Sequence, residues 1–98
     1  MSEEAVRIDI WLWRARFMKT RGLATSYVGK RRVRIGDGPQ RRRIEKASAV
    51  VRPGDILTFP LRNRIVSLKI MALGERRGPA EEARQLYEPI NEEDAPDV

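Results

Sequence analysis

The chain contains neither cysteine nor histidine among its 98 residues. Without cysteine it can form no disulfide framework and no thiolate zinc site. Without histidine it lacks the commonest general base and the commonest metal ligand. The carboxylates do not fill this gap, because Asp9 and Asp55 fall at an expected helix start and an expected turn, and most others lie near the C-terminus. We therefore expect no enzymatic activity, no metal site and no cofactor.

Long apolar runs are also absent. No segment approaches the roughly 18 apolar residues that a membrane span requires, and the first four residues are acidic without an apolar signal core. We expect a cytoplasmic protein with no membrane partner and no small-molecule substrate. A chain of 98 residues that is 41% hydrophobic predicts one folded domain, and we expect a monomer.

Positive charge is in excess, and it is unevenly distributed. The first 70 residues contain 17 lysines and arginines and six acids, whereas the last 28 residues have a net charge of −5. Such clustering indicates a polyanionic partner, because neutralising phosphates releases their condensed counterions. Charge alone also fits another acidic partner, an anionic membrane or an arginine-rich solvated surface.

Two segments with apolar residues at three- and four-residue spacing predict helices at about 9–18 and 20–30. Asp9 and Thr20 are the expected N-caps, because their side-chain oxygens can accept bonds from unpaired amides. Only Lys19 separates the two helices, so a sharp turn should pack them together.

The apolar period then changes to two, which predicts short strands. They are expected at 33–35, 49–51, 56–59 and 64–72, with a hairpin between Pro60 and Asn63. Residues 40–46 fit either an exposed loop or an edge strand. A last helix is expected at about 79–88, with Tyr87 packing beneath it.

The order of elements predicts an α+β fold. Two N-terminal helices should pack on one face of a small, mainly antiparallel sheet, with a short C-terminal helix added. We divide the chain into a main domain at 6–72, an extension with the short helix at 73–90 and an acidic, disordered tail at 91–98, after a frayed lead-in at 1–6.

Several motifs occur in the order and spacing of a known domain. They are Arg7-Ile8-Asp9 with Leu12, then Thr20-Arg21, Gly29, Val33-Arg34-Ile35 and Gly54-Asp55. Together they resemble the RNA-binding domain of ribosomal protein S-four. Four further motifs narrow the resemblance to the bacterial fifteen-kilodalton heat-shock protein family. They are Trp11-Leu12-Trp13, Arg16-Phe17, Arg76-Arg77 and Leu86-Tyr87. The resemblance spans about residues 6–88.

This resemblance implies an alpha-L type RNA-binding fold that binds structured RNA through the first two helices and the following basic loop. The resemblance to the heat-shock family further implies that the chain binds the large ribosomal subunit, notably one stalled with a peptidyl-tRNA. The chain departs from the pattern in having two additional residues between Gly29 and Val33, and Gly36-Asp37 where Asn-Gly is usual. Its acidic tail also replaces the basic tail of some relatives.

We expect RNA contacts from basic residues in both helices, the helix-to-strand exit and the arginine-rich loop. The predicted RNA-binding residues are Arg7, Arg14, Arg16, Lys19, Thr20, Arg21, Lys30, Arg31, Arg32, Arg34, Arg41, Arg42, Arg43 and Lys46. Thr20 and Arg21 form the most specific of the predicted phosphate contacts, because free amides, a hydroxyl and a guanidinium can converge there on one phosphate. The plainer alternative is that Thr20 only caps the helix and Arg21 is only solvated.

Other residues leave alternatives open. Arg16 follows Asp9 by seven positions, so it can pair with Asp9, contact RNA or do both. Trp11 fits the edge of the core, whereas Trp13 can stack on a base or pack against the C-terminal helix.

Three further functions compete with RNA binding. The first two helices can form a helix-turn-helix that binds DNA, although the second helix has few base-reading residues. The chain can also be a protein-interaction adaptor that uses its acidic tail and aromatic surface, or an accessory domain of a separate RNA-modifying enzyme.

Overall fold

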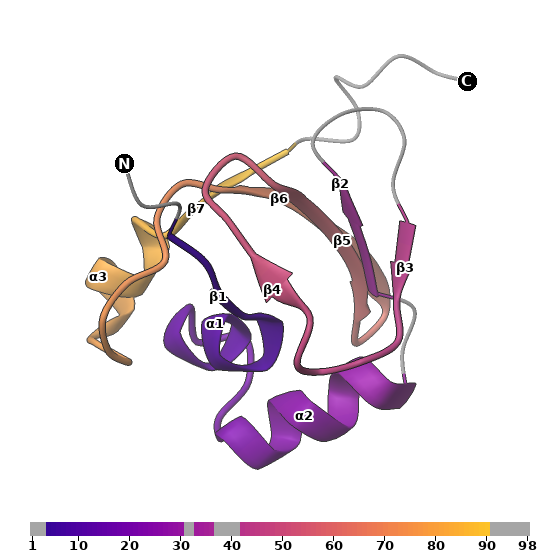
Figure 1. Cartoon of the computed structure of the whole chain (residues 1–98). Coiled ribbons are helices and arrows are strands. Elements are labelled where there is room, and N and C mark those ends of the chain that lie inside the picture. The colour runs from indigo at the N-terminus through magenta and orange to yellow at the C-terminus, as the bar shows by residue number, and fades with distance from the viewer. Residues whose placement is uncertain (1–3, 31–32, 37–41, 91–98) are drawn as a thin grey trace.

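Two helices lie against one face of an antiparallel sheet in the computed structural model (Figure 1). The structure describes residues 4–30, 33–36 and 42–90. Its elements are β1 (Val6–Arg7), α1 (Ile8–Arg14), α2 (Arg21–Lys30), β2 (Val33–Gly36), β3 (Arg42–Ile44), β4 (Val50–Val51), β5 (Ile56–Leu61), β6 (Arg64–Ile70), α3 (Ala80–Arg84) and β7 (Tyr87–Pro89). The predicted α+β class and the packing of two helices on the sheet are confirmed.

The main sheet has the strand order β3-β2-β5-β6-β7, and each neighbouring pair is antiparallel. Side chains alternate between its faces, so Val33, Leu57 and Phe59 point toward the helices and are fully buried. Arg34, between two buried neighbours, is exposed on the helix-free face. β1 and β4 form a separate antiparallel pair beside the start of α1.

An aromatic cluster joins the helices to the sheet. Trp11 is fully buried, and its indole nitrogen donates to the Ala72 carbonyl at 3.0 Å. Phe17 stacks on Trp11 and meets Phe59 edge-on at 5.4 Å between ring centroids. The expected core position of Trp11 is confirmed, and Trp13 is half-buried.

The N-terminal predictions need three corrections. The first helix ends at Arg14 and not near residue 18, because Arg16 adopts a φ of 67°, which a right-handed helix cannot contain. Asp9 lies inside the first turn and is not the N-cap, which is Arg7. Val6 belongs to β1 and not to a frayed lead-in, because β4 supplies its pairing partner.

The C-terminal helix is shorter than predicted. α3 ends at Arg84, and Tyr87 to Pro89 instead form β7 at the edge of the sheet, where a proline without an amide is tolerated. Tyr87 therefore packs against Phe17, at 4.9 Å between ring centroids, and not beneath its own helix. β6 ends at Ile70, two residues before the predicted end.

Residues 40–46 were predicted to form either an exposed loop or an edge strand. Part of this segment, Arg42–Ile44, forms the edge strand β3. β3 pairs with β2 in a register that sets Ile44 opposite Val33 and Arg43 opposite Arg34. Gly36 ends β2, and Asp37, which follows it in place of the usual Asn-Gly pattern, lies outside the described residues. None of the helices described in the structure is long and apolar enough to cross a membrane.

Substitution of Phe59 by alanine tests the role of the aromatic cluster. Phe59→Ala removes a fully buried ring, so we expect the free energy of unfolding to fall by about 3–5 kcal/mol in a urea titration. Leu23→Ala is the control, because Leu23 is 53% exposed on α2. It should change stability by less than about 0.5 kcal/mol; equal losses would contradict this description of the core.

Candidate nucleic-acid interface

The Asp9 carboxylate connects β1, α1 and α2. It accepts bonds from Arg7 Nε at 3.1 Å and Arg7 Nη2 at 2.8 Å. The Thr25 hydroxyl donates to it from α2 at 2.9 Å, and the Ile10 amide donates at 2.8 Å. The Asp9 side chain is only 3% exposed, whereas the Arg7 side chain is 47% exposed. A buried acid thus fixes an arginine whose remaining donors can reach a phosphate.

The environment of Asp9 keeps it ionised. Burial alone would raise the pKa of Asp9, but the hydrogen bonds from Arg7 and Thr25, the Arg7 charge and the Ile10 amide together outweigh burial. The pKa of Asp9 is consequently below the ordinary aspartate value of 3.8. Arg7 and Asp9 therefore form a charged pair at neutral pH, and the carboxylate can orient the guanidinium.

The N-terminus of α2 lies next along the chain from α1. The Thr20 hydroxyl accepts the Leu23 amide at 3.0 Å, which confirms Thr20 as the cap of this helix. Arg21, the first helical residue, is exposed, and the first turn contains no acidic residue. The partial positive charge of the helix end is therefore not neutralised locally.

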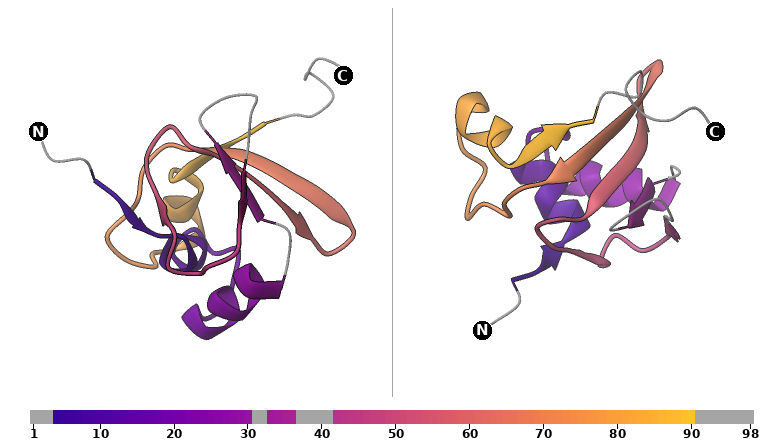
Figure 2. Two further views of the ribbon diagram at one scale, coloured as in Figure 1. Left: turned by 45° about the vertical axis from the view of Figure 1, so that its right-hand side comes forward. Right: turned by 90° about the horizontal axis from the view of Figure 1, so that it is seen from above.

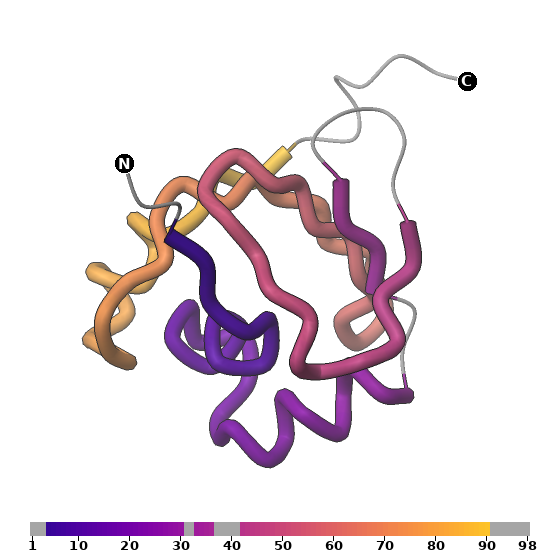
Figure 3. The backbone as a smooth tube through the Cα atoms, viewed as in Figure 1, coloured from indigo at the N-terminus to yellow at the C-terminus, as the bar shows by residue number. Residues whose placement is uncertain are grey.

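A third basic segment reaches the same region. The backbone amide of Asp9 donates to the Ala47 carbonyl at 3.4 Å, and the Ile8 amide donates to the Ala49 carbonyl at 2.7 Å. The chain after β3 consequently runs beside the start of α1 (Figure 3). Lys46, which directly precedes Ala47, is exposed there.

The other predicted RNA-binding residues fall into three groups. Lys19, Lys30, Arg34, Arg42 and Arg43 are exposed. Arg34 and Arg43 are directly opposite each other on β2 and β3, and such a like-charge pair gains from an anion. Arg31, Arg32 and Arg41 lie outside the described residues.

Arg14 and Arg16 have a different geometry. Arg14 Nη1 donates to the Gly74 carbonyl at 2.7 Å, and Arg16 Nε donates to the Gly78 carbonyl at 2.6 Å. Arg77 returns a bond to the Trp13 carbonyl at 3.1 Å. These bonds fasten the segment after β6 to the end of α1. The pairing of Arg16 with Asp9 is wrong, because Arg16 lies beyond the helix end and bonds elsewhere.

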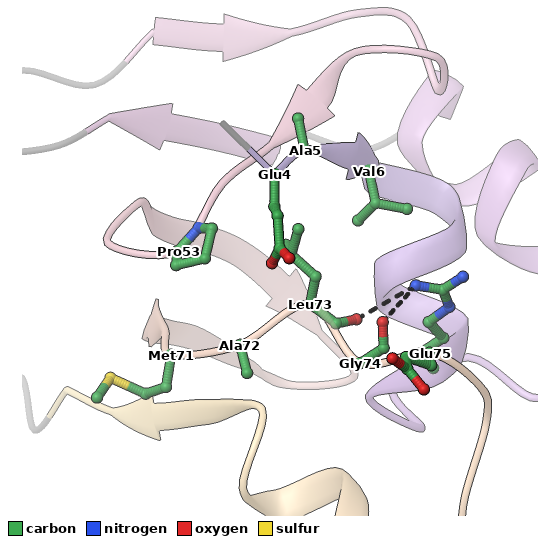
Figure 4. A pocket seen from close by; sticks show the side chains of 10 residues that line it. Glu4, Ala5, Val6, Pro53, Met71, Ala72, Leu73, Gly74 and Glu75 are labelled. Atoms are coloured by element: carbon green, nitrogen blue, oxygen red, sulfur yellow. Dashed lines mark hydrogen bonds between the residues drawn. The ribbon is translucent and has the colours of Figure 1, made fainter. Parts of the chain in front are cut away.

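A cavity of about 630 Å³ lies between β1 and residues 71–75 (Figure 4). Arg14 lines it, but the guanidinium is bonded to two carbonyls of its wall. Glu4 and Glu75 also line the cavity, so acids and an occupied arginine make it unsuitable for a phosphate. Among the described residues, no cluster of three acids is placed to hold a metal ion.

Thr25 belongs to the Asp9 network, and the sequence did not identify this role. Its hydroxyl has two acceptors within reach, Asp9 and the Arg21 carbonyl one turn earlier. The only signal was its position four residues after Arg21, which places both on one helix face. That spacing does not reveal a partner 16 residues away.

Several known proteins are similar to this chain. It is 38% identical over 88 residues to the heat shock protein 15 homolog of Haemophilus influenzae, covering 90% of this chain and 63% of the relative. It is 40% identical over 83 residues to heat shock protein 15 of Escherichia coli K12, covering 85% of this chain and 59% of the relative. The chain thus spans about three-fifths of the length of these curated relatives.

A solved structure gives the same comparison in three dimensions. The trimeric structure of Vibrio cholerae heat shock protein 15 matches with a TM-score of 0.77 at 36% identity. The match covers 91% of this chain and 85% of the Vibrio chain. Comparison with models of protein families gives no match.

Replacement of Asp9 by asparagine tests the network through its pH dependence. Because folding lowers the Asp9 pKa, the ionised carboxylate stabilises the fold above pH 3.8, and this contribution is lost as the pH falls through the folded value. We expect Asp9→Asn to cost about 2 kcal/mol at pH 7, since it weakens charged hydrogen bonds. The difference from the wild type should shrink below about pH 4 in urea titrations.

Thr25→Val is the matched control. It removes the hydroxyl bond but keeps the Arg7–Asp9 ion pair, so most of the pH-dependent difference should remain. A stability difference for Asp9→Asn that is constant from pH 3 to 7 would show that the charge of Asp9 contributes nothing.

Proposed function

Since the chain belongs to the heat shock protein 15 family, as its motifs predicted, we propose that it binds structured RNA. The proposed contact is the α1–α2 surface, which we define as Arg7, Lys19, Thr20, Arg21 and Lys46. Binding through these residues requires no catalytic step.

One observation carries the proposal, namely that a buried carboxylate orients Arg7 beside a basic helix end. Asp9 bonds both Arg7 and Thr25, so the guanidinium is attached to the helix that begins with Arg21. A fixed guanidinium loses less conformational entropy on binding than a free side chain. With the free amides of α2, Arg7 and Arg21 provide donors for one or two neighbouring phosphates.

The same geometry favours RNA over the helix-turn-helix alternative. A recognition helix needs polar side chains that are free to contact base edges. On α2 the Thr25 hydroxyl is engaged by Asp9, and Ser26 is the only other short polar side chain after Arg21. A surface of cations and amides suits backbone contacts, which dominate the recognition of A-form RNA.

The RNA we propose is ribosomal RNA of the large subunit, in a cytoplasmic response to heat shock. The names of the relatives support the stress response, and the family resemblance supports the ribosome and a stalled peptidyl-tRNA. A monomer stays the prediction for this chain, while the Vibrio relative is described as trimeric.

Substitution of Arg21 tests the α1–α2 surface. We expect Arg21→Gln to weaken binding of a ribosomal RNA fragment by about tenfold, because one phosphate contact is lost. The slope of log affinity against log salt should fall by about one. Arg84→Gln is the matched control, since Arg84 is exposed at the end of α3; equal losses would indicate only a net-charge effect.

Two further measurements separate the alternatives. In a gel shift at matched salt, tighter binding of duplex DNA than of ribosomal RNA would reject the RNA proposal. Sedimentation of a lysate through a sucrose gradient should place the protein with the large ribosomal subunit at low salt and release it at high salt. If the chain is instead a protein-interaction adaptor, it should retain its function after charge reversal at both Arg21 and Arg42.

A further inference from the structure

The closed end of the β5–β6 hairpin is a basic surface that lies outside all the contacts described above. Leu61 and Arg64 form its last pair, so Arg62 and Asn63 make a two-residue loop. Residues 62–65 are all exposed. In both views of Figure 2 this end of the hairpin extends past the helices. We call residues 62–65 the hairpin tip.

Arg62 adopts a backbone conformation that suits glycine better than arginine. Its φ is 59°, in the left-handed region, where the Cβ of an L-residue crowds the following carbonyl oxygen. Short hairpin loops usually place glycine or asparagine at such positions. Arginine at this position costs stability, so its presence calls for a role of the side chain.

The tip is positively charged, and no acid lies nearby in its hairpin. Residues 56–70 include Arg62, Arg64 and Lys69 but no aspartate or glutamate. The adjacent strand β2 and the whole of α2 also lack acids. Within the described part of the chain, no hydrogen bond or ion pair engages the guanidinium of Arg62 or Arg64. Two such cations on a paired β-ribbon are complementary to phosphates.

An apolar residue completes the tip. Ile65 is 55% exposed and pairs across the strands with Pro60 on the helix-free face of the sheet. Two arginines and an asparagine beside one exposed isoleucine form a narrow, mixed surface. The wide, shallow minor groove of A-form RNA offers phosphates, ribose hydroxyls and sugar edges to such a surface.

We propose that the hairpin tip is a second RNA-binding site, at which Arg62 and Arg64 bind backbone phosphates of a double-helical segment. This inference rests on the RNA binding proposed for the α1–α2 surface. Pairing of Arg34 with Thr58 places the start of β2 at the tip end of the sheet, and Lys30 at the end of α2 precedes β2. The acid-free helix α2 therefore leads from the first site toward the second.

A second copy of the chain is a less suitable occupant of the tip. Two tips that met symmetrically would bring four arginines together, and like charges oppose association. Ile65 alone offers too little apolar area for a stable self-interface. Charge complementarity thus favours the RNA backbone.

Replacement of Arg62 by glycine separates stability from binding. Arg62→Gly relieves the left-handed strain, so we expect Tm to rise by about 2–5 °C in a thermal melt. The same substitution removes a phosphate contact, so affinity for a hairpin fragment of ribosomal RNA should fall about five- to tenfold at low salt. The double variant Arg62→Gly with Arg64→Gln should reduce the salt slope by about two. Arg84→Gln is again the control for net charge.

The outcomes distinguish this inference from the proposed function. If the wild type fails to bind structured RNA, the proposed function itself fails. If Arg21→Gln weakens binding while both tip variants keep wild-type affinity and salt slope, only the second site is rejected. Arg62→Gln keeps a side chain on the strained backbone, so a loss of affinity with an unchanged Tm supports the site even where glycine alters folding. A change of molecular mass on Ile65→Ser, measured by sedimentation, would assign the tip to self-association and overturn the proposal.

Discussion

The buried carboxylate of Asp9 is the constraint on which the N-terminal half of the molecule depends. Once its charge leaves water, it needs several donors at short range. Those donors come from β1, the first turn of α1 and the middle of α2, so satisfying one acid fixes the relative position of three elements. The surface that presents Arg7 and Arg21 to a polyanion follows from this internal requirement.

The arginines fall into two groups, those bonded within the fold and those available for a ligand. Arg14, Arg16 and Arg77 donate to main-chain carbonyls and fasten the segment between β6 and α3 to α1. These bonds serve packing, and at most part of each guanidinium is left for a ligand. The formal net charge of +6 therefore does not measure the number of cations available for binding. Geometry selects the available ones, and they lie mainly on α2, the paired strands and the hairpin tip.

The features that depend on local pattern were predictable. Thr20 caps α2, the alternation at residues 33–35 forms a strand, and the fold class follows from the order of such segments. The predictions that were wrong concern features that depend on partners distant in sequence. β7 forms because β6 offers an open edge, Arg16 finds a carbonyl 62 residues away, and β1 exists only through β4. The sequence near Tyr87 does have helical periodicity, but pairing with β6 stabilises an extended strand there more than the periodicity stabilises a helix.

The separation of charge along the chain becomes a separation in space. The acids Glu4 and Glu75 border the cavity near Arg14, and Glu81 and Glu82 begin α3, whereas α2, β2 and the β5–β6 hairpin contain none. Because α2, β2 and the β5–β6 hairpin carry cations without acids, the molecule has a directional field, and that field orients it as it approaches a polyanion. Orientation alone does not require a strained backbone at a hairpin loop, because an arginine on a relaxed strand would add the same charge. The position of Arg62 is thus better explained by a specific contact than by long-range attraction.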